Sequence, residues 1–544
     1  MHCITNYLTS GGYSIINLVR TLIDPSKILQ MTFKKYPRIS QQLRVEKNLQ
    51  ILLHLQENYS IFVRYMYALV LQSILEIHRN DKKFIFSIFS QQVLDKLLFY
   101  VKDITANGLN DDKNEFLIVI LWILNDISCL HTKFADYLVS SKLIEYSFKI
   151  IEDSLSDSMD SHELVIAVSQ TFTSLISCAN NIKKSQQKDL VKFIMSQIID
   201  FYGANQLLSS IDESITEHKD SLDYVLNLIN SINKLLSQNN DKIYNTMMNN
   251  QYSEKFLMTV IQIWKAKSFQ LRLISDSTLQ EDYHYSEMLQ ISEFFYQILQ
   301  FQDEYIIERV FGFRIVQTMQ VVLENMYRSQ NSRFTDALLS NLLKCVCNIL
   351  STHEVDKVCD YLLKQSSLLK DIFLIVMQDK WKLGRELLDM ISQIIQNLTF
   401  VSDVWCIQDL FDKYIIHASL FIMRMAMDLD EIQIIQVNLM SLISFSQGDM
   451  DIDSQFIHQY FYQNYQLRDL FNQIAQDFIF EDTKESFFEF LESIGSKYDD
   501  DLELMENVDK LINYVFKVDS DEDELDVDNK CGEAEMTLNQ QHDN

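Results

Sequence analysis

Apolar residues recur along the chain in segments whose spacing fits one face of an α-helix. Within each segment, hydrophobic side chains stand three and four positions apart, which is the period of an amphipathic or buried helix. Most of the segments follow one another at roughly 40 to 50 residues, the length of one helical repeat unit. The seven clearest segments span residues 62–78, 164–181, 224–240, 288–301, 338–352, 387–400 and 434–449.

Residues 115–151 show how one such unit is built. The pattern predicts a long helix over 115–128, a short one over 133–139 and a medium one over 142–151. This order is typical of the junction between two armadillo repeats, where the third helix of one repeat leads into two helices of the next. Polar stretches at 152–163 and 209–221 are predicted to be loops exposed to solvent.

Units of two or three helices are too small to bury their own apolar faces, and stacking them creates a continuous core. We therefore expect an all-α protein, a right-handed α-solenoid of armadillo/HEAT-like repeats over residues 61–517. Residues 1–60 form an N-terminal segment, and residues 518–544 form an acidic tail. The alternative is a large irregular helical domain without a binding groove.

Composition supports helices and limits the partners. Only 9 Gly and 2 Pro occur in 544 residues, too few for many tight turns between strands. The formal net charge of −29 disfavours a direct nucleic-acid ligand, because a phosphate backbone requires the opposite charge. The charge either favours a basic partner or only keeps a large helical surface soluble.

Sequence motifs of enzymes, metal sites and membrane segments are not found. No phosphate-binding glycine loop, zinc-protease motif or nucleophile elbow occurs, so we expect neither an enzyme nor a cofactor or metal site. The eight cysteines show no C-x-x-C spacing, and we expect most of them to be buried thiols in a reducing compartment. The longest uncharged apolar run, residues 116–124, is shorter than a membrane span, so we expect no membrane insertion.

The segment "WILND" carries a resemblance to a known family. Trp122 stands four residues before Asp126, so both side chains lie on one helix face. The segment resembles the W-x-x-x-N signature of importin alpha, the armadillo-repeat adaptor for proteins with basic nuclear localisation signals. The resemblance implies that the tryptophan forms a slot for lysine stems and that the asparagine hydrogen-bonds the backbone of the cargo peptide.

Two further segments match in the same register. "KCVCNILST" places Asn348 at the asparagine position and Lys344 at the tryptophan position. "QIIQNLTF" places Asn397 at the asparagine position and Gln393 at the tryptophan position. The departures from the signature affect the chemistry. Asp126 replaces the asparagine, and an ionised carboxylate accepts hydrogen bonds without donating any. Lys344 would repel a basic side chain.

Both ends of the chain extend the resemblance. The aromatic-ended helix before the acidic run resembles the closing helices of importin alpha, whose tail contributes to recognition by a recycling export receptor. The acidic residues concerned are Asp519, Asp521, Glu522, Asp523 and Glu524. Residues 33–47 contain short basic clusters, the nearest candidate for the segment that binds importin beta in this family. An unstructured acidic tail and an ordinary solvated helix end are the simpler interpretations of these two stretches.

The resemblance predicts a nuclear import adaptor that shuttles between cytoplasm and nucleus and holds Lys/Arg-rich signals in an acidic concave groove. The alternative is an armadillo/HEAT scaffold for protein–protein interactions that does not bind such signals. The simpler interpretation of Trp122 is core packing, and that of Asn348 and Asn397 is termination of a helix. Several tryptophans along one face would favour the adaptor, whereas Trp122 alone would favour the scaffold. We expect Trp264, Trp381 and Trp405 to be mainly core or interface residues.

Overall fold

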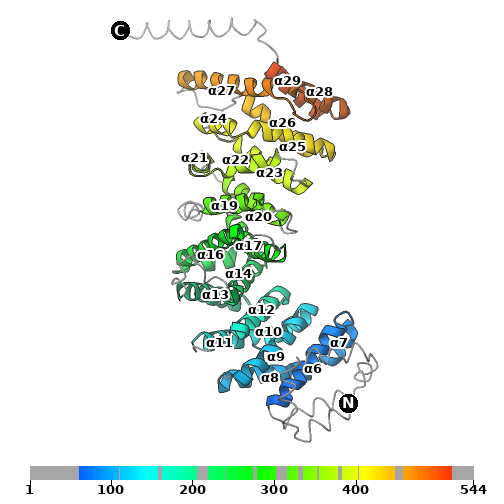
Figure 1. Cartoon of the computed structure of the whole chain (residues 1–544), viewed down its shortest axis with the longest axis vertical. Helices are drawn as coiled ribbons and strands as arrows, with labels where there is room; N and C mark the ends of the chain where they lie inside the picture. The colour runs from blue at the N-terminus through cyan, green and yellow to red at the C-terminus, as the bar shows by residue number, and fades with distance from the viewer. Residues whose placement is uncertain are drawn as a thin grey trace, which may run out of the picture. The chain divides into compact units, whose positions relative to one another are not determined.

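The described part of the chain is built from α-helices, as the sequence predicts. The computed structural model describes residues 61–109, 111–156, 162–204, 219–238, 240–273, 278–301, 315–328, 335–351, 355–377, 383–401, 404–447 and 457–516. These ranges contain 23 helices and one isolated antiparallel bridge, between Ile479 and Ser486 (Figure 1). The predicted N-terminal segment and the predicted acidic tail lie outside the described residues.

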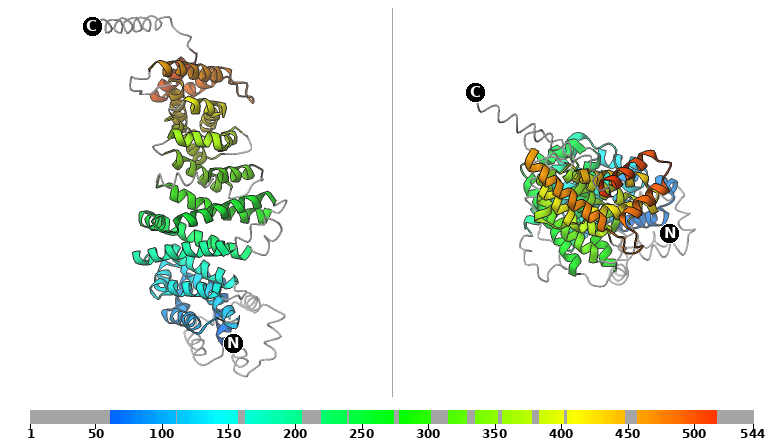
Figure 2. Two further views of the ribbon diagram at one scale, coloured as in Figure 1. Left: turned by 90° about the vertical axis from the view of Figure 1, so that its left-hand side faces the viewer. Right: turned by 90° about the horizontal axis from the view of Figure 1, so that it is seen from above.

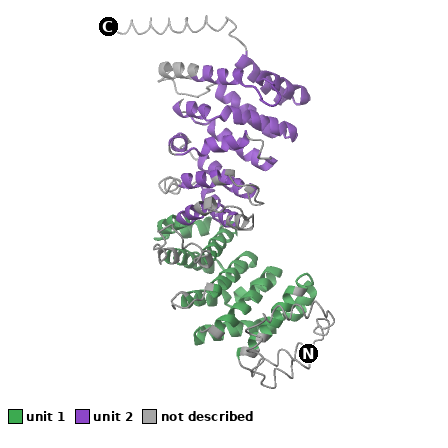
Figure 3. Ribbon diagram, in the orientation of Figure 1, with its two compact units in different colours: residues 1–260 green, residues 261–544 purple. Residues whose placement is uncertain are grey.

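The chain divides into two compact units, residues Met1–Val260 and Ile261–Asn544 (Figure 3). In unit 1, four helices pack one against the next in a continuous row. We call helices in such a row ladder helices. Those of unit 1 are α6 (Ile61–His78), α9 (Asp111–Leu130), α12 (His162–Cys178) and α14 (Lys219–Gln238).

The other helices of unit 1 cover the ladder from its sides. Helix α8 packs on α9 and α11, while α13 packs on α14 and α15. Helix α16 (Ser253–Leu273) begins in unit 1 and continues into unit 2. The remaining helices of unit 1 are α7 (Lys82–Ile88), α8 (Gln91–Asn107), α10 (Thr132–Ser140), α11 (Leu143–Ser156), α13 (Lys184–Ala204) and α15 (Asn240–Met248).

Unit 2 repeats the arrangement in a more regular form, with three parallel rows of helices. Its ladder helices are α17 (Thr278–Leu299), α20 (Thr335–Leu350), α23 (Arg385–Leu398), α26 (Ile432–Gln447) and α29 (Leu502–Phe516). The second row consists of α19 (Ile315–Arg328), α22 (Leu368–Val376) and α25 (Ile415–Asp428). The third consists of α21 (Val355–Gln365), α24 (Val404–Asp412) and α27 (Ile457–Asp477), which lie one above the other in Figure 1. Helix α28 (Phe487–Lys497) packs against α29.

One helix from each row makes a repeat of three helices, so α21, α22 and α23 form one repeat and α24, α25 and α26 form the next. Three-helix repeats of this length are the armadillo pattern. Figure 2 shows the resulting layers of helices from a second direction. The all-α solenoid predicted from the sequence is confirmed in both units.

The seven apolar segments found in the sequence correspond to ladder helices α6, α12, α14, α17, α20, α23 and α26. A ladder helix inside a row, such as α12 or α23, packs against a ladder neighbour on each side as well as against other helices. More of its circumference is therefore covered, and it carries more apolar residues than a helix with one buried face. The three-helix prediction for 115–151 is also confirmed, by α9, α10 and α11.

One boundary differs from the prediction. The loop predicted from residue 152 begins later, because α11 continues to Ser156 and buries the side chain of Ser154. Lys142 occupies the turn between α10 and α11 with a φ of 68°, a left-handed conformation that usually favours glycine. Tyr414 has a φ of 72° at the corresponding turn between α24 and α25. The chain therefore makes this armadillo turn without glycine.

Most of the described cysteines are at least partly buried, as expected. Cys345, Cys359 and Cys406 are buried, whereas Cys129 is exposed. No single helix in the described ranges is long and apolar enough to span a membrane. Helices α7 and α8 reach that length and composition only as a pair that meets at a bend of 62°.

Candidate peptide-binding face

The six predicted site residues fall into two groups, one in each unit. Trp122 and Asp126 lie on ladder helix α9 of unit 1. Lys344 and Asn348 lie on α20, and Gln393 and Asn397 on α23, which are neighbouring ladder helices of unit 2. The residues predicted within each unit therefore do come together on ladder helices.

On α9, Trp122 and Asp126 are both half-buried. Trp122 is therefore partly covered by neighbouring side chains. Burial raises the pKa of Asp126, Arg79 opposes this effect with its positive charge, and Glu76 reinforces it. The Asn125 amide lies beside Asp126, with Nδ2 3.5 Å from Oδ1. Asp126 thus occupies a partly desolvated position beside one cation.

On α20, Lys344 is held by two neighbours. Its Nζ lies 3.4 Å from Oε1 of Glu386 on α23 and 5.5 Å from the centre of the Tyr296 ring on α17. Both contacts compensate the positive charge. One turn further along α20, Asn348 is half-buried, and its Nδ2 atom is buried with no hydrogen-bond partner among the described residues.

On α23, Gln393 is exposed and Asn397 is half-buried. The Gln393 amide donates to Oδ2 of Asp389 at 3.3 Å, and the Asn397 amide donates to Oγ of Ser351 at 3.2 Å. The contact with Ser351, just beyond the end of α20, ties the two helices together. We call the surface formed by Lys344, Asn348, Gln393 and Asn397 the amide face.

The ladder helices are joined by hydrogen bonds between polar side chains, which the sequence patterns did not single out. The Asn438 amide of α26 donates to Oγ of Ser392 on α23 at 2.8 Å, and Asn341 of α20 donates to Ser292 of α17 at 3.2 Å. In unit 1, Asn227 of α14 donates to Ser169 of α12 at 3.0 Å. The donor and acceptor of each pair lie 46 to 58 residues apart, about one repeat. A search for Asn and Ser recurring at that spacing would have found them.

The other tryptophans do not extend a binding face along the ladder. Trp264 is fully buried and stacks on Phe295 with ring centres 4.9 Å apart, which confirms the prediction of a core residue. Trp405 is 71% exposed on α24, outside the ladder. Trp381 lies outside the described residues, as do the basic residues at 33–47 and the acidic run from Asp519 to Glu524. Trp122 is therefore the single tryptophan on a described ladder helix.

Comparison with known proteins identifies no family for this chain. No protein-family model matches the chain, and no curated protein is similar to it in sequence. Among solved structures, a chain from a study of the interaction between cadherin and beta-catenin shares 10% identity at a TM-score of 0.45, covering 92% of this chain and 91% of its own. A crystal structure of SYS-1 shares 12% identity at a TM-score of 0.40, covering 94% of this chain and 100% of its own.

A crystal complex of SYS-1 and POP-1 shares 10% identity at a TM-score of 0.26, covering 87% of this chain and 99% of that chain.

Proposed function

We propose that this protein is a scaffold for protein–protein interactions, without catalytic activity, and that its amide face binds an extended segment of a partner. The observation that carries the proposal is the placement of Asn348 and Asn397 in the same register on neighbouring ladder helices. Side-chain amides both donate and accept hydrogen bonds, so each can pair with a peptide group. A row of half-buried side-chain amides suits a partner that presents its backbone.

The spacing of the helices fits such a segment. Packed helices lie about 8–10 Å apart, and an extended chain rises roughly 3.3 Å per residue. Amides on α20 and α23 would therefore meet peptide groups about three residues apart. Phe400, directly after α23, is 71% exposed, and its backbone N–H donates to the Asn397 carbonyl at 3.3 Å. Exposed aromatic residues commonly anchor protein interfaces.

A more specific form of the proposal is nuclear import of basic cargo. Glu386 and Asp389 are exposed carboxylates beside the amide face, and they would attract a lysine-rich segment. Trp122 and Asp126 on α9 could hold a lysine stem and its ammonium. The nuclear-import proposal includes binding to importin beta, recycling by an export receptor, and shuttling between cytoplasm and nucleus. The single tryptophan on the ladder favours the general scaffold.

The scaffold is tested by selecting peptides from a display library on the full-length protein. We expect binders whose affinity falls on Asn397→Ala and Phe400→Ala. Trp405→Ala is the matched control, because Trp405 is equally exposed but lies outside the ladder. A library that gives no binders, or binders that respond equally to all three substitutions, would refute the amide face.

Nuclear import is tested separately by fluorescence anisotropy. A lysine-rich nuclear localisation peptide should bind and weaken with salt, and its alanine-substituted form should not bind. Trp122→Ala should weaken binding if the tryptophan forms a slot for lysine. Absence of binding to this peptide alongside successful library selection would leave the scaffold standing and exclude the adaptor.

A further inference from the structure

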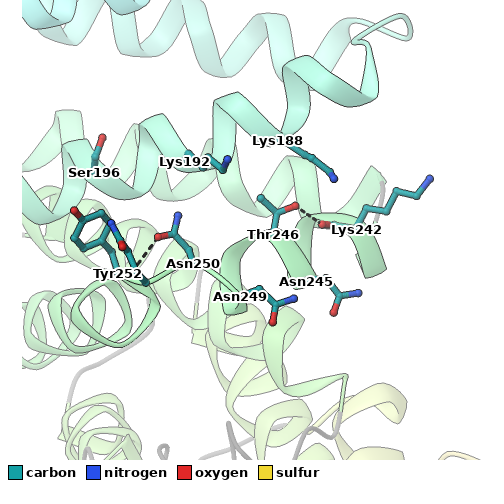
Figure 4. Close-up of a pocket in the computed structure, with 10 residues that line it drawn as sticks. Lys188, Lys192, Ser196, Lys242, Asn245, Thr246, Asn249, Asn250 and Tyr252 are labelled. Atoms are coloured by element: carbon teal, nitrogen blue, oxygen red, sulfur yellow. Dashed lines mark hydrogen bonds between the residues drawn. The ribbon is translucent and has the colours of Figure 1, made fainter.

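A cavity of about 760 Å³ opens between α13 and α15 in unit 1. Its lining includes three lysines, Lys188 and Lys192 from α13 and Lys242 from α15 (Figure 4). No carboxylate lines it, although acidic residues outnumber basic ones 76 to 47 along the chain. The two nearest acidic residues in sequence, Asp189 and Asp241, are not part of the lining. The lining of the cavity therefore carries a positive charge, although the protein as a whole is acidic.

The lysines are not neutralised within the described part of the chain. No described carboxylate forms an ion pair with Lys188, Lys192 or Lys242. Lys184, Lys188 and Lys192 follow each other at four-residue intervals on one face of α13, a spacing at which like charges destabilise a helix. Contact with the Lys184 ammonium lowers the pKa of Lys242, and the charge of Lys188 adds to this effect. A bound anion would relieve the repulsion.

The opposite wall supplies amides. Asn245 and Asn249 lie one turn apart on α15, and both are exposed. Figure 4 shows them on the helix that also carries Lys242, opposite the helix that carries Lys188 and Lys192. Tyr252, 49% exposed, also lines the cavity. The walls therefore combine cations for carboxylates, amides for peptide groups and an aromatic ring for an apolar side chain.

We propose that this lysine cleft, lined by Lys188, Lys192, Lys242, Asn245, Asn249 and Tyr252, binds an extended acidic peptide segment of a partner protein. The cations are all lysines, whose ammonium groups act as point charges and attract the carboxylates of such a segment. The net charge of −29 also repels a long phosphate backbone more strongly than a short peptide. The cleft shares no residue with the amide face, so this inference goes beyond the proposed function.

The test measures binding of a fluorescent glutamate-rich peptide to the full-length protein at low and near-physiological salt. The charge variant is Lys188→Gln with Lys192→Gln and Lys242→Gln. The matched control is Lys82→Gln with Lys83→Gln and Lys102→Gln, which removes the same charge from exposed lysines of α7 and α8. All six lysines are exposed, so the folds of both variants should be preserved, which circular dichroism verifies.

We expect the peptide to bind, the charge variant to lose roughly tenfold in affinity or more, and the control to lose much less. Asn249→Ala should weaken binding without changing its salt dependence, because the amide carries no charge. The measurements are repeated with Asp519, Asp521, Glu522, Asp523 and Glu524 changed to amides, which removes competition from the chain's own acidic residues.

Three results would overturn the proposal. The first is that the peptide binds neither the protein with its acidic residues at 519–524 intact nor the protein with these residues changed to amides. The second is that the charge variant and the control lose the same affinity for the peptide. The third is a single-stranded oligonucleotide of matched charge binding more tightly than the peptide, which would make the cleft a nucleic-acid site.

Discussion

Lys267 of α16 and Glu287 of α17 form an ion pair in the interior of unit 2. Nζ of the lysine lies 2.6 Å from Oε2 of the glutamate, and the two side chains are 4% and 5% exposed. Removing one partner breaks a buried ion pair, which costs about 3–5 kcal/mol. We expect Lys267→Met to lower the free energy of unfolding by this amount in urea denaturation.

The double substitution Lys267→Met with Glu287→Leu provides the control. Replacing both charges by apolar groups of similar size should restore most of the stability, because neither charge then has to be desolvated. A double variant as unstable as Lys267→Met would show that packing around these positions, rather than charge pairing, causes the loss.

Replacing Lys142, in the left-handed turn between α10 and α11, by glycine is predicted to stabilise the protein. The left-handed conformation costs an L-residue about 1–2 kcal/mol, and glycine loses about 0.5–1 kcal/mol through chain entropy. Lys142→Gly should therefore raise the free energy of unfolding by up to about 1.5 kcal/mol. Thermal unfolding checks this, with Lys102→Gly in the middle of α8 as a destabilising control of about 1 kcal/mol.

Cys129 is predicted to react as a thiolate near neutral pH. A hydrogen bond from the Cys178 thiol lowers the pKa of Cys129 to about 6, and the hydroxyls of Ser174 and Ser128 contribute in the same direction. Alkylation by iodoacetamide, followed by mass spectrometry, should fall to half its rate near pH 6 as the thiolate is protonated. The alkylation rate of an ordinary cysteine thiol falls to half near pH 8.5.

Cys178→Ala removes the main donor, so the half-point of Cys129 alkylation should move upward in pH. Cys347 is the internal comparison, because burial raises its pKa to about 12 and it should react slowly throughout. Identical pH profiles for the wild type and Cys178→Ala would contradict the assigned hydrogen bond.

Substitution of Trp264 and substitution of Trp122 should lower the stability of the protein by different amounts. Trp264→Ala removes a fully buried ring stacked on Phe295 and should cost about 3–5 kcal/mol. Trp122→Ala removes a half-buried ring and should cost less than about 2 kcal/mol. Equal losses in calorimetric melting would make Trp122 a core residue and remove it from the candidate site.

Sequence patterns predicted the ladder helices because burial on several sides requires many apolar residues. The shorter helices of the other rows, such as α21, bury only one stripe and are less conspicuous. Asn348 and Asn397 were found because they share a register within similar segments. The lysine cleft was missed because its cations come from two helices about 50 residues apart, and only Lys184, Lys188 and Lys192 form a pattern within one helix.

The sequence by itself determined the helical class, the repeat length and the ladder segments. Each of these depends on short-range periodicity and on the free energy of burying apolar side chains, and both are properties of local sequence. Only the tertiary structure decided which polar residues became partners. The contacts of Lys267 with Glu287, Asn397 with Ser351 and Cys129 with Cys178 each join different helices. Such pairs depend on the rotation and register of packed helices, which a single segment does not specify.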